Sequence, residues 1–139
     1  MPIREATTDS DIARCYDVMA ELRPHIPRDD FVARVRRQMQ TGYLLAFIED
    51  AGAVVCAAGY RYVDNLYCGL NMYVDDLVTT PATRSKGHGK AMIRWLIDLA
   101  RAKGCSQLHL DSAVHRFGAH RFYLREGFDI TSHHFAMKL

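Results

Sequence analysis

The chain has 139 residues, of which 49% are hydrophobic and 24% charged, with a formal net charge of +2. This composition is typical of a globular protein with one hydrophobic core. The small net charge does not favour a nucleic-acid-binding protein, and no apolar run approaches the length of a membrane span. The amino terminus lacks the basic and then apolar build of a signal peptide. We therefore expect a single domain over residues 1–139, located in the cytoplasm, with neither a nucleic acid nor a membrane as partner.

The first half of the chain predicts two helices among four strands. Side-chain oxygens between Thr7 and Asp11 suit the beginning of a helix, and the prolines within residues 23–27 end it. A second helix is predicted to begin at Arg28 and to end at Gly42. The strands predicted around these helices cover residues 3–6, 43–49, 53–60 and 70–79.

The second half alternates helices with strands. Residues 91–103 have the clearest helical pattern, with apolar side chains on one face and charged side chains on the other. A further helix is predicted over residues 116–126, and strands over residues 106–111, 128–130 and 133–139. The resulting order, β-α-α-β-β-β-α-β-α-β-β, has three consecutive strands in its middle. This order favours an α/β fold with a mixed sheet and helices on both faces.

A basic segment with two glycines lies between the strand at 70–79 and the helix at 91–103. It consists of Arg84, Ser85, Lys86, Gly87, His88, Gly89 and Lys90. At such a junction the free N–H groups of the first helical turn can bind an anion, and glycine lets a bulky ligand approach the backbone. The spacing does not fit a P-loop, and Met92 stands where a dinucleotide fingerprint requires its third glycine. We therefore expect a pyrophosphate-binding loop, with a purely structural glycine turn as the alternative.

Two segments resemble signature motifs of the GNAT superfamily of N-acetyltransferases. Residues 77–91 are similar to its acetyl-CoA-binding motif, with Arg-x-x-Gly-x-Gly after a strand and before a helix. Residues 119–128 are similar to its Ala-x-x-Phe/Leu-Tyr-x-x-x-Gly-Phe segment. The predicted order of elements also matches, so the resemblance covers essentially the full chain. It implies a GNAT-like fold and acetyl-CoA as co-substrate without a metal. The final strands offer edges that homodimers of this family often use, so a homodimer and a monomer both stay open.

The resemblance also implies how the cofactor segment works. The backbone of Leu77, Val78 and Thr79 would pair with the pantetheine arm, and the N–H groups of residues 84–90 would hold the pyrophosphate. A splay of β-bulge type between the fourth and fifth predicted strands would expose backbone N–H groups that polarise the thioester carbonyl.

The resemblance further assigns a role to Tyr123, which would lie near the thioester sulfur. As a phenol it could donate a proton to the departing CoA thiolate. The alternative is an aromatic side chain of the core, on the same helical stripe as Phe122. Many family members have Asn seven residues before this Tyr, where this chain has Arg116, so that contact is not carried over.

The acceptor amine must lose a proton, because most amines are protonated at pH 7. Asp75 and Asp76 interrupt an otherwise apolar strand just before the cofactor segment. Many GNAT enzymes have an acidic residue at the position of Asp75, so we expect Asp75 first and Asp76 second to accept this proton. A salt-bridged or solvated pair is the alternative. Since adjacent strand residues point to opposite faces, the two are not expected to act as one dyad.

These features predict an enzyme that transfers the acetyl group of acetyl-CoA by direct attack of a primary amine. The acceptor is expected to be a small molecule or a peptide, with Phe31 and Tyr67 as candidate aromatic residues of its pocket. The alternative function is a non-catalytic acyl-CoA-binding or sensory domain. A metal site built from His109, Asp111 and His115 is not favoured, because these residues have no supporting ligand pattern.

Overall fold

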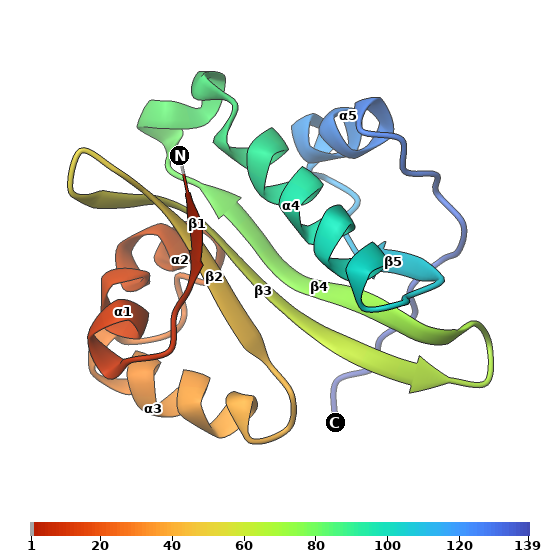
Figure 1. Ribbon diagram of the computed structural model, residues 1–139, viewed down its shortest axis with the longest axis horizontal. Helices are drawn as coiled ribbons and strands as arrows, with labels where there is room; N and C mark the ends of the chain where they lie inside the picture. Colours follow the sequence, from red (N-terminus) through yellow and green to blue (C-terminus); the bar gives the residue numbers. More distant parts are fainter. Residues whose placement is uncertain (1) are drawn as a thin grey trace. The chain divides into compact units, whose positions relative to one another are not determined.

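The computed structural model describes residues 2–139 (Figure 1). It divides into two compact units: the first ends at His109, and the second spans Leu110–Leu139. The single domain predicted over residues 1–139 stays a prediction.

A five-stranded sheet is the framework of the first unit. Its strands are ordered β1-β2-β3-β4-β5, and each neighbouring pair from β1 to β4 is antiparallel. The sequence predicts each of these strands, although β3 continues past the expected end. The bounds are β1 (Ile3–Glu5), β2 (Leu44–Asp50), β3 (Ala53–Asn65), β4 (Gly69–Thr79) and β5 (Gln107–Leu110).

Helices cover both faces of this sheet in the first unit. Figure 1 shows α1, α2 and α3 on one face and α4 on the other. The first predicted helix is divided in two at Cys15, and it begins as expected, because the Thr8 hydroxyl accepts a hydrogen bond from the Asp11 N–H at 3.1 Å. The bounds are α1 (Asp9–Arg14), α2 (Tyr16–Leu22), α3 (Arg28–Met39), the 3-10 helix η1 (Pro81–Lys86) and α4 (His88–Ala102).

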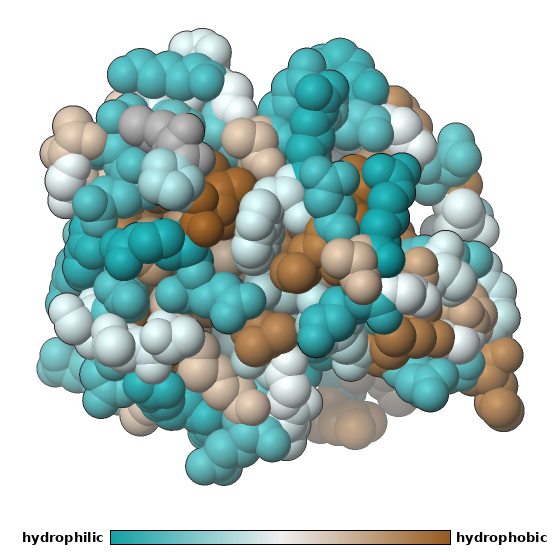
Figure 2. All heavy atoms as spheres, viewed as in Figure 1, coloured by the Kyte–Doolittle hydropathy of each residue, from teal (hydrophilic) through white to brown (hydrophobic). Residues whose placement is uncertain are grey.

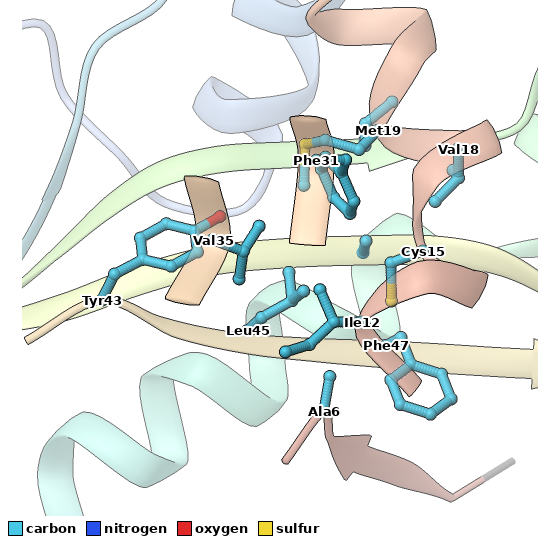
Figure 3. Close-up of a cluster of buried hydrophobic side chains, with 12 residues drawn as sticks. Ala6, Ile12, Cys15, Val18, Met19, Phe31, Val35, Tyr43, Leu45 and Phe47 are labelled. Atoms are coloured by element: carbon cyan, nitrogen blue, oxygen red, sulfur yellow. The ribbon is translucent and has the colours of Figure 1, made fainter. Parts of the chain in front are cut away.

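The main core lies between α1–α3 and the sheet (Figure 3). Ile12 and Cys15 of the helices and Leu45 and Phe47 of β2 are almost completely buried there. Alternate residues of β2 point to the other face and pack under α4, where Met92 and Leu96 are completely buried as the helical pattern predicts. Both faces of the sheet are therefore apolar in its centre. The packing of helices on both faces fixes the position of β4.

The surface is mixed in character. Figure 2 shows hydrophilic side chains over much of the face in view, with apolar residues in separate patches. Each helix formed by residues 2–139 is too short or too polar to cross a membrane.

The second unit departs from the prediction. Its helix α5 (Phe117–Arg125) is present, but the two final strands predicted over residues 128–130 and 133–139 are not formed. The apolar side chains that suggested these strands are exposed, among them Phe135 and Met137. Alternating apolar residues indicate a strand face, but a strand also needs a neighbour that takes up its backbone hydrogen bonds.

Candidate functional site

The junction between β4 and α4 has the geometry of an anion site. After β4 the chain forms η1, and Gly87 then precedes α4 with φ 82° and ψ 13°. No side chain caps this start of α4, and nothing lies within 4 Å of the position that a Gly87 Cβ would occupy. The first-turn N–H groups of a helix have no partner inside the helix, so they remain for an external acceptor. The predicted loop is thus part 3-10 helix and part first helical turn.

The side chains of this segment fall into two groups. Arg84, Ser85, Lys86 and Lys90 are exposed, as side chains that contact a phosphate would be. His88 is different, because it is only 8% exposed and its Nε2 lies 3.8 Å from the Asp50 carboxylate. This Nε2 has no hydrogen-bond partner among the described residues. Any contribution of His88 to cofactor binding is therefore restricted to its backbone.

The end of β4 keeps one backbone edge outside the sheet. Leu77–Thr79 pair with Cys56–Ala58 of β3 on one side. On the other side β5 begins next to the start of β4, where the Ser106 N–H donates to the Leu70 carbonyl at 2.9 Å. At about 3.3 Å per residue, β5 spans roughly 13 Å, whereas Leu77 lies roughly 23 Å beyond Leu70. Strand β5 therefore cannot pair with Leu77–Thr79, whichever way it runs.

A β-bulge interrupts the pairing of β3 with β4. Gly59 pairs with Asp76, and Tyr60 pairs with Val74, so Asp75 is the additional residue. The bulge thus lies between the third and fourth strands, and the splay predicted between the fourth and fifth strands stays a prediction. Since a bulge breaks the alternation of faces, Asp75 and Asp76 line the same cavity. The prediction that they point to opposite faces of the sheet is wrong.

Both aspartates have protein partners. The Arg61 guanidinium donates to both Asp75 oxygens, with its Nη2 at 2.7 Å from Oδ2 and its Nε at 3.1 Å from Oδ1. The Asp76 carboxylate accepts from Arg23 Nε at 2.9 Å and from the Tyr43 hydroxyl at 2.8 Å. The Asp76 side chain is only 12% exposed. These contacts hold the two carboxylates in fixed orientations.

Tyr43 connects this cluster. Its hydroxyl binds Asp76, and the Arg61 guanidinium lies over its ring at 5.5 Å from the centroid. Burial first, and the nearby Asp76 second, raise the pKa of Tyr43 far above its usual value, so the phenol is a permanent donor. Gly59 makes room for it, because a Cβ there would lie 1.9 Å from the Tyr43 oxygen. Figure 3 shows the Tyr43 ring beside Val35 of α3, on the face of the sheet that α1–α3 cover.

The sequence did not single out Arg23, Tyr43 and Arg61 for this site. Arg23 directly follows α2, Tyr43 directly precedes β2 and Arg61 lies in β3, so only folding brings them together. The one available signal was Gly59, because a glycine inside an apolar strand marks a close approach or a bulge.

A cavity of about 380 Å³ opens beside these residues in the first unit. It lies between the α2–α3 region and β4, and Phe31 contributes to it as expected. Tyr67 is not among the described residues of this lining, and it is 76% exposed. The lining comprises Met19, Arg23, His25, Ile26, Phe31, Arg34, Val35, Gln38, Tyr43, Tyr73, Asp75 and Asp76.

In the second unit, Tyr123 lies in an aromatic cluster. Its ring centroid is 5.4 Å from that of Phe122 and 5.7 Å from that of Phe128. Burial raises its pKa, and the charge of Arg116 offsets part of this effect. The phenol therefore keeps its proton at neutral pH, which is the form that a proton donor needs. The contacts are equally compatible with the alternative role of an aromatic packing residue.

Two of the three residues considered for a metal site have other contacts. His109 lies 3.8 Å from the Cys68 sulfur, and Asp111 lies 3.4 Å from His134. Within residues 2–139, no group of three or more His, Cys, Asp or Glu is arranged to hold a metal ion.

Comparison with known proteins identifies the family. A sequence model described as the acetyltransferase (GNAT) family matches residues 8–128. The chain belongs to this family. The GNAT membership confirms the predicted family and the predicted acetyltransferase activity.

Individual GNAT relatives agree with this assignment. An uncharacterized N-acetyltransferase of Bacillus subtilis, YhdJ, is 31% identical over 96% of this chain and 95% of its own length. Glucosamine 6-phosphate N-acetyltransferase 1 of rice, Oryza sativa, is 28% identical over 86% of this chain and 76% of its own length. Among solved structures, an aminoglycoside N-acetyltransferase in complex with CoA is similar, with a TM-score of 0.85 at 16% identity, over 99% of this chain and 93% of that chain. The last comparison confirms the GNAT-like fold.

Proposed function

We propose that the protein transfers the acetyl group of acetyl-CoA directly to the primary amine of a small molecule or peptide. The observation that carries this proposal is the arrangement along β4. The strand has two carboxylates in a cavity at Asp75 and Asp76, then an edge at Leu77–Thr79 that β5 cannot reach. The uncapped start of α4 follows directly. An acceptor site and a cofactor site thus occupy consecutive parts of one backbone.

Backbone groups of the first unit would make most of the contacts with the cofactor. The N–H groups at the start of α4 would bind the pyrophosphate, with Arg84, Lys86 and Lys90 as additional cations. The open edge of Leu77–Thr79 would pair with the pantetheine arm as an added strand does, and its N–H groups would polarise the thioester carbonyl. Acetyl-CoA supplies the activated acetyl group, and the protein supplies orientation.

Proton transfers at the two ends of the reaction are assigned to side chains. Asp75, with Asp76 as second candidate, would accept the proton of the acceptor amine, directly or through a water molecule. Because both carboxylates already have cationic or phenolic partners, a water molecule is the simpler route to either. Tyr123 would protonate the leaving thiolate, and its raised pKa keeps this proton in place until then.

The names of the relatives support an amine acceptor. The rice relative is named for the acetylation of glucosamine 6-phosphate, and the solved relative for that of aminoglycosides. We also propose a homodimer and a cytoplasmic location. Light scattering during gel filtration tests the first, and a monomer at all concentrations would contradict it. Cell fractionation tests the second.

A non-catalytic acyl-CoA-binding or sensory domain is the second candidate. Both functions predict that acetyl-CoA raises the melting temperature, so a thermal shift tests the cofactor site alone. Release of the CoA thiol over a panel of amines separates the two functions. Thiol release that depends on an amine supports the enzyme, whereas tight cofactor binding without any turnover supports the sensor.

A further inference from the structure

The two carboxylates of the cavity are already neutralised. Asp75 is held by Arg61 through both oxygens, and Asp76 is held by Arg23 and by the Tyr43 hydroxyl. A ligand with only ammonium groups would have to compete with these guanidinium groups. The cavity therefore does not have the excess of negative charge that would attract a polycation.

The excess charge of the cavity is positive. Three guanidinium groups, those of Arg23, Arg34 and Arg61, accompany the two carboxylates. His25 also lines the cavity. One of the three guanidinium groups thus has no ion-pair partner among residues 2–139.

That cation is Arg34. Helix α3 also contains Arg28 and Arg36, but these form ion pairs with Asp17 and Asp9 on the outer surface. Arg34 lines the cavity, and none of the described residues forms an ion pair with it. A guanidinium at the wall of a small cavity is suited to bidentate binding of a carboxylate or a phosphate group.

The unpaired donors and the two carboxylates come from different parts of the chain. Arg34 and Gln38 lie on α3 and His25 on the connection before it, whereas Asp75 and Asp76 lie on β4. Apolar side chains, among them Phe31, complete the lining. A volume of about 380 Å³ is near the lower end of the range for small-molecule sites, so the ligand is small.

We propose that the acceptor is a small amine that also carries a compact anion, with its amine toward β4 and its carboxylate, phosphate or phosphonate bound by Arg34. The proposal rests on the proposed acetyl transfer, since it names the acceptor class of that site. The anion would give Arg34, which is exposed at the cavity, the kind of partner that Asp17 and Asp9 give to Arg28 and Arg36.

Matched pairs of acceptors test the proposal on the wild-type protein. β-Alanine is compared with β-alaninamide, and 2-aminoethyl phosphate with 2-aminoethanol, by release of the CoA thiol. The anion-bearing member of at least one pair is expected to have a kcat/KM about tenfold higher, because a charge-assisted contact is gained. The pair with the larger ratio distinguishes a carboxylate from a phosphate. Equal kcat/KM within both pairs would overturn the proposal.

A substitution of Arg34 on α3 tests whether this residue binds the anion. Arg34→Gln is expected to raise KM about tenfold for the anion-bearing acceptor and to leave the anion-free partner unchanged. Arg37→Gln is the matched control, since Arg37 is exposed on the same helix and is not part of the described lining. An equal effect of Arg34→Gln on both members of a pair, or no effect, would overturn the assignment of Arg34.

Calorimetry distinguishes a failure of the proposed acetyl transfer from a failure of the proposed anion binding. If no amine releases thiol, the proposed transfer fails, but binding of the same four compounds is still measurable. Binding of an anion-bearing amine that Arg34→Gln weakens about tenfold supports the anion site without turnover. No binding, or binding that Arg34→Gln does not change, overturns it.

Discussion

The start of α4 and the cavity beside β4 represent two ways of building a binding site. The first consists of backbone groups from one short segment, with Gly87 in a left-handed conformation and no capping side chain. The second is lined by residues of α2, α3 and β4 and of the connections beside them, which are far apart in the sequence. Consequently, the first site follows from local chemistry and the second only from the complete fold. Substitutions should affect the two sites differently. The first should respond to added charge and bulk, and the second to changes in side-chain shape and ion pairing.

The largest effect is expected from Gly89→Asp at the start of α4. A carboxylate in the first turn would oppose the pyrophosphate, whereas it suits the helix dipole, so the protein should fold normally. Acetyl-CoA binding, measured by calorimetry, should weaken by at least about a hundredfold, since charge and bulk act together. Ala102→Asp is the control, because it places the same charge at the far end of α4. Unchanged affinity of the Gly89 variant would remove the pyrophosphate assignment.

A comparable loss of turnover is expected from Asp75→Asn. If this carboxylate accepts the amine proton, kcat/KM should fall about a hundredfold at neutral pH and recover as the pH approaches the pKa of the free amine. Asp76→Asn is the matched variant, and a larger effect there would transfer the role to Asp76. A similar small loss in both, with an unchanged pH profile, would support the alternative of a structural pair.

Tyr123→Phe should act on turnover rather than on binding. Loss of the proton donor is expected to lower kcat about tenfold to a hundredfold, with a smaller change in KM for acetyl-CoA. Because burial raises the pKa of Tyr123, the wild-type rate should not fall through loss of this proton between pH 7 and the ordinary phenol value of about 10. Equal kcat for both proteins would leave Tyr123 a packing residue.

The smallest effect is expected from Gly59→Ala. The added Cβ would overlap the Tyr43 ring, displace the hydroxyl from Asp76 and destabilise the protein by about 1–3 kcal/mol. KM for the acceptor should rise, while the affinity for acetyl-CoA should change little. Gly118→Ala is the control, since no atom lies within 4 Å of a Cβ at that position. Denaturant unfolding and the two affinities check this, and unchanged stability would contradict the close contact.

The same contrast explains what the sequence could predict. The strands of the first unit, the amphipathic α4 and the basic junction follow from periodicity and glycine spacing, which are local. The face of Asp75 did not follow, because a bulge is set by the partner strand. The partners of both aspartates could not be predicted either, since Arg23, Tyr43 and Arg61 are far apart in the sequence. The final strands were predicted from alternation alone, which does not reveal whether a neighbouring strand is present.

The additional residue in β4 has a consequence for how such an enzyme can change over time. The open edge of Leu77–Thr79, which we propose for the cofactor, and the two aspartates are consecutive on one strand, so their separation is set by the peptide backbone. Insertions elsewhere in the chain leave this spacing intact. Other residues of the cavity lining lie on α2 and α3, which are separate from this strand. New acceptor preferences can therefore arise by exchange of those side chains while the acetyl-donor half of the protein stays the same.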